Sequence, residues 1–236
     1  FISRAAPANA MSPGRELGLS YIFYNNQFLA NQGVFAENMY NDQIAGFQGV
    51  TFGGRWLWRP INDENNTLHV GVNFRYANIC TGEVYNNTLK TEYTIGTSLE
   101  TYVDPTKQFV SATMPWAKNV YDLGAELLYK NDNFFIRGEY MYKTVTKERD
   151  DQTLFEANLG SIDSWGTLES WQKGNPLGTN KFHGGYVEAG YKIFGNPYKY
   201  SNSEGLLKGF DGKSLEVVAR YSYVGLNDIV EGERYV

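Results

Sequence analysis

Apolar and polar side chains alternate one by one along several stretches of about ten residues each. Within residues 134–143, Ile136 and Tyr140 belong to an apolar set, whereas Arg137 and Glu139 belong to a charged set. Successive side chains of a β-strand point to opposite faces, so this period predicts strands with one apolar and one charged face. The same alternation occurs in residues 50–58, 68–77, 120–129, 183–193 and 215–224. We therefore expect a nearly all-β chain.

Two architectures have strands with two such faces: a soluble β-sandwich and a membrane β-barrel. Sandwich strands are commonly about five or six residues long, whereas membrane strands need about nine to eleven. The lengths here favour the barrel, and aromatic residues near the expected strand ends are typical of the lipid headgroup level. These aromatic residues are Trp56, Trp58, Tyr76, Tyr129, Tyr140, Tyr142, Tyr221 and Tyr223. We predict a transmembrane antiparallel β-barrel with lipid on the Tyr140 side and water on the Arg137 side.

The connections between strands also differ in length. Residues 130–133 (KNDN) form a tight turn, whereas residues 144–181 form a long, polar connection with several glycines. Outer-membrane barrels combine short periplasmic turns with longer extracellular loops. We expect one β-barrel domain over residues 1–236, with residues 144–181 outside the cell.

Composition excludes several other classes of protein. The 236 residues carry a net charge of −5, which argues against nucleic acid as a partner. No run of eighteen apolar residues occurs, so no transmembrane helix is expected. Cys80 is the only cysteine, which excludes an internal disulfide.

Enzyme motifs are incomplete. Residues 209–214 (GFDGKS) end like a phosphate-binding loop, but Leu207 stands where that motif needs a glycine. His69 and His183 have no ligand partners at metal spacing. Glu126 and Glu139 could imitate a glycosidase pair, but we expect them to form ion pairs with Arg137 instead. No catalytic activity, cofactor or metal is predicted.

Four segments together resemble the phosphate-selective porin O and P family. They are residues 8–19 (ANAMSPGRELGL), 52–76 (FGGRWLWRPINDENNTLHVGVNFRY), 120–140 (VYDLGAELLYKNDNFFIRGEY) and 184–228. The resemblance implies a trimeric outer-membrane barrel of Gram-negative bacteria, with about sixteen strands in the full chain. It also implies an anion path lined by basic residues and inward-folded loops. Only about nine or ten strands can be placed here, so we expect further strands before Phe1 and after Val236.

Residues 195–213 (GNPYKYSNSEGLLKGFDGK) are too long for an ordinary periplasmic turn. The resemblance implies that this segment folds into the lumen. The alternative is a solvated turn with ordinary surface lysines. The candidate pore-lining residues are Lys199, Lys208 and Lys213 on this segment, and Arg55, Arg75, Arg137, Lys143, Lys192 and Arg220 on the strands.

The chain departs from the family in one respect. The family has an arginine-rich stretch in the region that here reads TIGTSLETYVDP (residues 94–105), which contains no arginine. The polar strand faces also carry carboxylates, namely Asp122, Glu126, Glu139, Glu188 and Glu216. We predict an outer-membrane homotrimer in contact with lipid that lets small hydrophilic solutes diffuse, with a modest preference for anions such as phosphate.

Two other functions remain open at this point. One is a soluble or surface β-sandwich that binds carbohydrate through Trp165 and Trp171. The other is a barrel that serves as the membrane partner in a larger envelope assembly.

Overall fold

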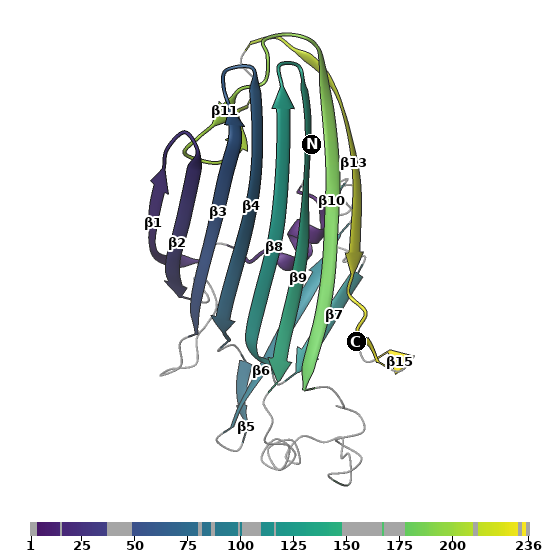
Figure 1. Cartoon of the computed structure of the whole chain (residues 1–236). Helices are drawn as coiled ribbons and strands as arrows, with labels where there is room; N and C mark the ends of the chain where they lie inside the picture. Colours follow the sequence, from purple (N-terminus) through teal and green to yellow (C-terminus); the bar gives the residue numbers. More distant parts are fainter. Residues whose placement is uncertain are drawn as a thin grey trace.

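Eight antiparallel strands form one sheet, in the order β1-β2-β3-β4-β8-β9-β10-β13 (Figure 1). The computed structural model describes residues 4–14, 16–36, 49–79, 82–85, 88–98, 100, 110–115, 117–147, 167, 178–209, 212–230 and 233–234. The strands of the sheet are β1 (Leu17–Tyr24), β2 (Phe28–Ala36), β3 (Val50–Asn62), β4 (Asn66–Asn78), β8 (Ala117–Asn131), β9 (Phe134–Lys147), β10 (Thr179–Phe194) and β13 (Leu215–Gly225). The predicted all-β class is confirmed.

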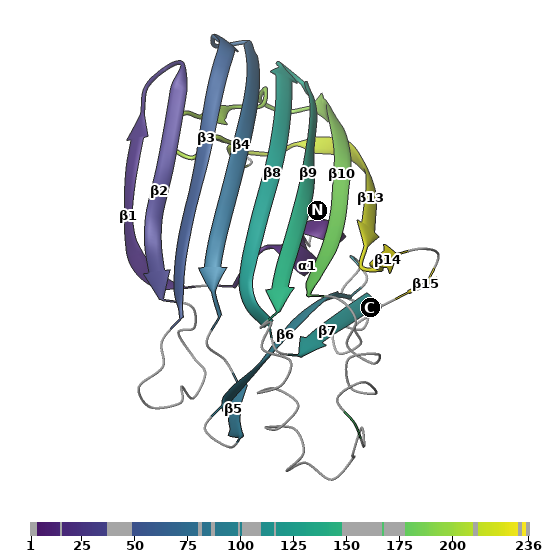
Figure 2. The same cartoon turned by 60° about the horizontal axis from the view of Figure 1, so that its bottom comes forward.

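The sheet is a single curved layer, and further described elements lie on its concave side (Figure 2). Among them are the helix α1 (Ala6–Met11) and the strands β6 (Thr88–Thr97) and β7 (Val110–Pro115). Ile95, Met114, Val120 and Phe182 form a buried apolar cluster with Met11 at one end of the strands. A second β-sheet packed over the whole layer, as in a sandwich, is absent from the described residues.

The alternation along the strands gives the sheet two different faces. Val72, Tyr140 and Val217 are exposed on the convex face, where 52 %, 52 % and 61 % of their surfaces are accessible. The other set of side chains points to the concave face, where α1 lies. The two-faced strands expected from the sequence are thus confirmed, and an apolar convex face of this kind suits lipid.

Strand lengths and aromatic positions differ in part from those expected. β3, β4, β8, β9 and β10 have 13, 13, 15, 14 and 16 residues, because polar residues extend them beyond the apolar stretches. Trp56 and Tyr140 therefore lie in the middle of β3 and β9, and their expected place at strand ends is wrong. Near one end of the strands, Tyr76 does lie in an aromatic row between Phe52 and Tyr121, with ring centroids 6.4 and 5.1 Å away.

The tight turn lies where it was expected, and the bounds of the long connection differ from those expected. Asp132, at a φ of 38°, and Asn133 form the tight turn between β8 and β9. β9 and β10 extend into residues 144–181, so the connection is shorter than predicted, and residues 148–166 and 168–177 lie outside the described part. Trp165 and Trp171 are among them.

Short strands complete the described chain. β11 (Tyr200–Ser201) and β12 (Leu206–Leu207) pair within the segment that connects β10 to β13, and β14 (Ile229–Val230) pairs with β15 (Glu233–Arg234). β5 (Gly82–Tyr85) pairs with β6. None of the described helices has the length and apolar character needed to cross a membrane.

Candidate functional site: the inner wall

The polar residues of the concave face, here called the inner wall, are arranged in charge groups. The first group runs straight across three strands, because Arg75 on β4 lies opposite Asp122 on β8, and Asp122 lies opposite Lys143 on β9. The carboxylate of Asp122 is 3.3 Å from Nη1 of Arg75 and 2.6 Å from Nζ of Lys143. Glu16, just before β1, binds Nη2 of the same arginine at 3.0 Å.

A second group repeats this pattern on the next strands. Glu188 on β10 lies opposite Arg137 on β9 and opposite Arg220 on β13. Its Oε1 is 2.8 Å from Nη2 of Arg137, and its Oε2 is 2.7 Å from Nη2 of Arg220. Glu100 binds Nη1 of Arg220 at 3.0 Å and also accepts a hydrogen bond from the backbone N–H of Ala6.

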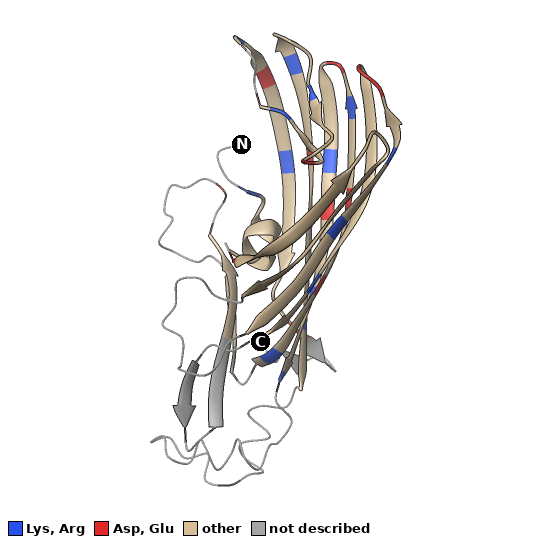
Figure 3. Cartoon of the chain, turned by 90° about the vertical axis from the view of Figure 1, so that its left-hand side faces the viewer, with Lys and Arg blue, Asp and Glu red and all other residues tan. Residues whose placement is uncertain are grey.

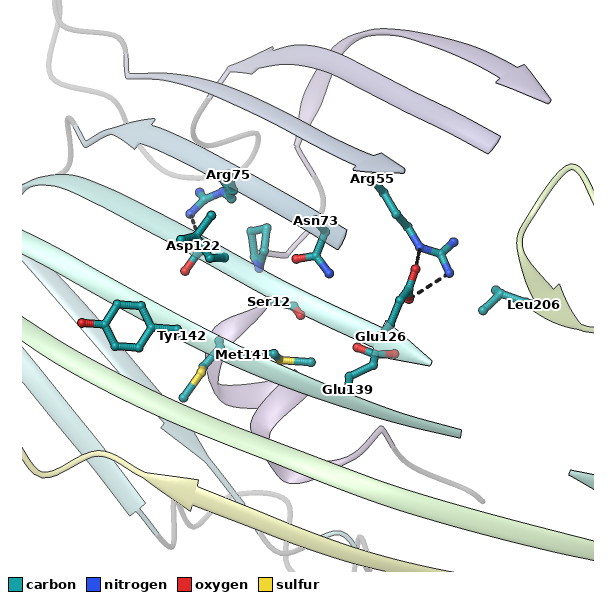
Figure 4. Close-up of a pocket in the computed structure, with 13 residues that line it drawn as sticks. Ser12, Arg55, Asn73, Arg75, Asp122, Glu126, Glu139, Met141, Tyr142 and Leu206 are labelled. Carbon is teal, nitrogen blue, oxygen red and sulfur yellow. Dashed lines mark hydrogen bonds and ion pairs between the residues drawn. The ribbon is translucent and has the colours of Figure 1, made fainter. Parts of the chain in front are cut away.

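Arg55 and Glu126 form a third pair, which spans a strand. Arg55 on β3 reaches over β4 and donates from Nε and Nη2 to the two oxygens of Glu126 on β8, at 2.8 and 3.1 Å (Figure 4). The contact passes over Gly71, where a Cβ would lie 2.5 Å from Oε1 of Glu126. The expected pairing of Glu126 and Glu139 with Arg137 is therefore wrong. Glu139 instead accepts a hydrogen bond from the hydroxyl of Tyr186 at 2.7 Å.

The described residues 195–209 and 212–214 are here called the inner segment, which crosses the concave face from β10 toward β3 (Figure 1). Nη1 of Arg55 donates to the carbonyl of Glu204 at 2.8 Å, and Nη2 donates to the carbonyl of Gly205 at 3.1 Å. Arg59, only 1 % exposed, donates to the carbonyl of Asn202 at 2.9 Å. These bonds hold the inner segment on the wall.

Arg59 is a buried cation of the inner wall that the sequence analysis missed. The sequence indicates its orientation, because residues 55, 57 and 59 are spaced two apart and therefore point to the same face of the strand. Its Nη2 also donates to the carbonyls of Asn25 and Phe28, so one guanidinium ties the β1–β2 turn to the inner segment.

A cavity of about 260 Å³ lies between the N-terminal segment and the inner segment. Ser12 and Leu206 border it from these two segments, while Arg55, Asp122 and Glu139 belong to its wall (Figure 4). Two arginines and three carboxylates line the cavity, so its formal net charge is low. Figure 3 shows the same mixture over the whole sheet, where basic and acidic positions are interspersed rather than collected in separate blocks.

The structure brings the predicted basic residues to one face but into different surroundings. Lys143 is fully buried and contacts the Tyr93 hydroxyl at 3.0 Å, and Lys192, 4 % exposed, donates to the carbonyl of Asn196 at 2.8 Å. Lys199, Lys208 and Lys213 are exposed on the inner segment. Arg55, Arg75, Arg137 and Arg220 take part in the ion pairs described above.

A one-layer antiparallel sheet with an apolar convex face and a charged concave face is the wall of a membrane β-barrel channel. The chain belongs to the phosphate-selective porin O and P family, whose family model matches residues 1–235. It is therefore an outer-membrane porin, and the sandwich alternative is wrong. No curated protein sequence matches the chain significantly.

Proposed function

We propose that this porin lets small hydrophilic solutes diffuse passively across the outer membrane, with a modest preference for anions such as phosphate. The observation that supports this most is that Lys199, Lys208 and Lys213 are exposed on a segment that lies over the concave face. The arginines of the inner wall form ion pairs with carboxylates and are expected to contribute less.

The preference follows from charge at a narrowing. Rings of basic side chains favour anions in a pore, and apolar walls with a low dielectric constant strengthen the effect of each charge. The inner segment supplies the exposed lysines and also occupies part of the lumen. A preference weaker than strict phosphate selectivity is expected, because residues 94–105 contain no arginine.

The wall cations have a secondary part in this proposal. Arg55 and Arg137, with about a quarter to a third of their side-chain surface accessible, line the path together with Arg75 and Arg220. Lys143 and Lys192 are buried and act on passing ions only through their electric field. The inner segment is assigned to the periplasmic side and residues 144–181 to the extracellular side, following the barrel pattern.

A charge-reversal experiment tests the proposal. Wild-type protein and a variant with Lys199, Lys208 and Lys213 all changed to Glu are placed in a planar bilayer under a potassium chloride gradient. The wild type is expected to give a reversal potential on the anion-selective side, and the variant on the cation-selective side. Lys118→Glu with Lys181→Glu, two exposed lysines of the sheet outside the inner segment, is the control. An unchanged reversal potential in the triple variant would show that the inner segment does not line the path.

The proposal includes a homotrimer. Native mass spectrometry of detergent-purified full-length protein is expected to give three times the chain mass. A monomeric mass that persists in mild detergents would refute the trimer without affecting the channel.

A further inference from the structure

We propose that Glu188 and Asp122 determine the specificity of the pore. The carboxylate of each residue occupies a site between two cations that would otherwise bind a phosphate-class oxyanion. This inference rests on the proposed function and assigns two residues that keep its anion preference modest.

The geometry around Glu188 is that of an anion site. Nε and Nη2 of Arg137 lie 3.1 and 2.8 Å from Oε1, while Nε and Nη2 of Arg220 lie 2.8 and 2.7 Å from Oε2. Each guanidinium thus directs two N–H groups at one carboxylate oxygen. Paired guanidinium groups recognise phosphate with the same planar fork of donors. The carboxylate side chain is only 3 % exposed, so it fills the space between the two arginines.

Asp122 stands between its two cations in the same way. Arg75 and Lys143 approach it from the strands on either side, and all three residues occupy directly opposed positions of the sheet. The order cation, carboxylate, cation over three adjacent strands therefore occurs twice, on β4-β8-β9 and on β9-β10-β13.

Charge accounts for the effect on selectivity. Two cations and one carboxylate leave a surplus of one positive charge in each group. A further carboxylate that is not on these strands reduces this surplus, namely Glu16 in the first group and Glu100 in the second. A chloride or phosphate ion passing the wall meets guanidinium groups whose N–H groups are already occupied. Removing the central carboxylate frees N–H groups that can bind an oxyanion and raises the local charge by one unit.

The test uses full-length protein in planar bilayers and measures two quantities: the chloride-to-potassium permeability ratio, and the block of chloride current by inorganic phosphate. Glu188→Ala removes the charge together with the side chain that fills the space between the two arginines. The half-blocking phosphate concentration is expected to fall at least about tenfold from the wild-type value, since charge-assisted bonds to oxyanions become available. The permeability ratio is expected to rise as well.

Glu139→Ala is the matched control. It removes the same charge from the same face, but among the described residues its carboxylate is bonded to the Tyr186 hydroxyl and to no cation. It should therefore alter the permeability ratio slightly without adding phosphate block. Equal behaviour of the two variants would overturn the proposal, because it would reduce the effect to overall charge.

Asp122→Ala repeats the experiment in the other group, should Glu188→Ala not fold. Folding is checked by the change in gel mobility between unheated and heated samples. If neither variant assembles, the carboxylates are needed for construction of the wall and the proposal is wrong. A wild-type protein that forms no channels would refute the proposed function. If the wild type conducts ions but the variants show the same phosphate block as the wild type, only this inference is refuted.

Discussion

The hydroxyl of Tyr200 lies 2.8 Å from Nδ1 of His69, although 131 positions separate the two residues in the chain. His69 belongs to β4 and is only 2 % exposed, and Tyr200 begins the short strand β11 of the inner segment. The bond fixes the inner segment to β4 near the start of that strand, three strands away from the origin of the segment in β10. It thereby positions the lysines that are proposed to select anions.

The two faces of β9 can be distinguished by chemical labelling. Single cysteines at Tyr140 and Arg137, in a Cys80→Ala background, should react at different rates with a small water-soluble thiol reagent. Position 137 faces the concave side and should react quickly, whereas position 140 faces lipid and should be protected. Protein reconstituted in lipid vesicles, followed by mass spectrometry, gives both rates. Faster reaction at position 140 would reverse the assignment of the faces.

Charge placed on the convex face should be costly. Val72→Arg puts a cation into lipid near the middle of β4, and we expect a loss of about 2–4 kcal/mol in the free energy of unfolding. Asn73→Arg places the same side chain beside the polar cavity of the inner wall, where the loss should be much smaller. Denaturant titration of protein refolded into lipid measures both values. Equal losses would contradict a lipid-facing convex surface.

Gly205 should be sensitive to substitution. Its φ of +68° favours glycine, and a Cβ there would collide with the side chain of Leu57. Gly205→Ala should therefore shift the inner segment off the wall and cost about 1–3 kcal/mol. Single-channel recordings should show more current noise and a changed conductance. Gly209→Ala, in the same segment with no atoms near its Cβ, is the control and should behave as wild type.

The β3–β4 turn should contribute a stability that depends on pH. Hydrogen bonds from the backbone N–H groups of Asn66 and Asn65, 2.7 and 3.0 Å long, lower the pKa of Asp63. A lowered pKa in the folded state means that the carboxylate stabilises the fold at neutral pH. This contribution is lost as the pH falls below the ordinary value of an aspartate and through the lowered one.

Asp63→Asn should remove that part of the acid dependence, measured by thermal unfolding in detergent between neutral and acidic pH. Glu64→Gln removes the same charge from the same turn but leaves these bonds in place, so it should keep the wild-type profile. Identical acid dependence in wild type and Asp63→Asn would exclude the turn as its source.

The alternation of side chains was sufficient to predict the strands and their two faces, because face is a local property of a strand. The pairing of Arg55 with Glu126 could not be predicted in this way. It needs the register of three strands and the absence of a side chain at Gly71, over which the two groups meet. Strand lengths were underestimated for a related reason, since hydrogen bonding continues into polar residues beyond the apolar stretch.

The same alternation has a consequence for how such a chain reaches its membrane. Because polar residues interrupt the apolar ones along the strands, the mean hydropathy is only −0.44, and no stretch of the sequence has the composition that stops a chain during export. The lipid-compatible surface does not exist in the extended polymer and is created only when the strands lie side by side. Unpaired backbone groups are also intolerable in hydrocarbon. The chain can therefore cross the inner membrane before it becomes compatible with lipid. Its integration into the outer membrane requires that the strands pair, so integration and folding are one process.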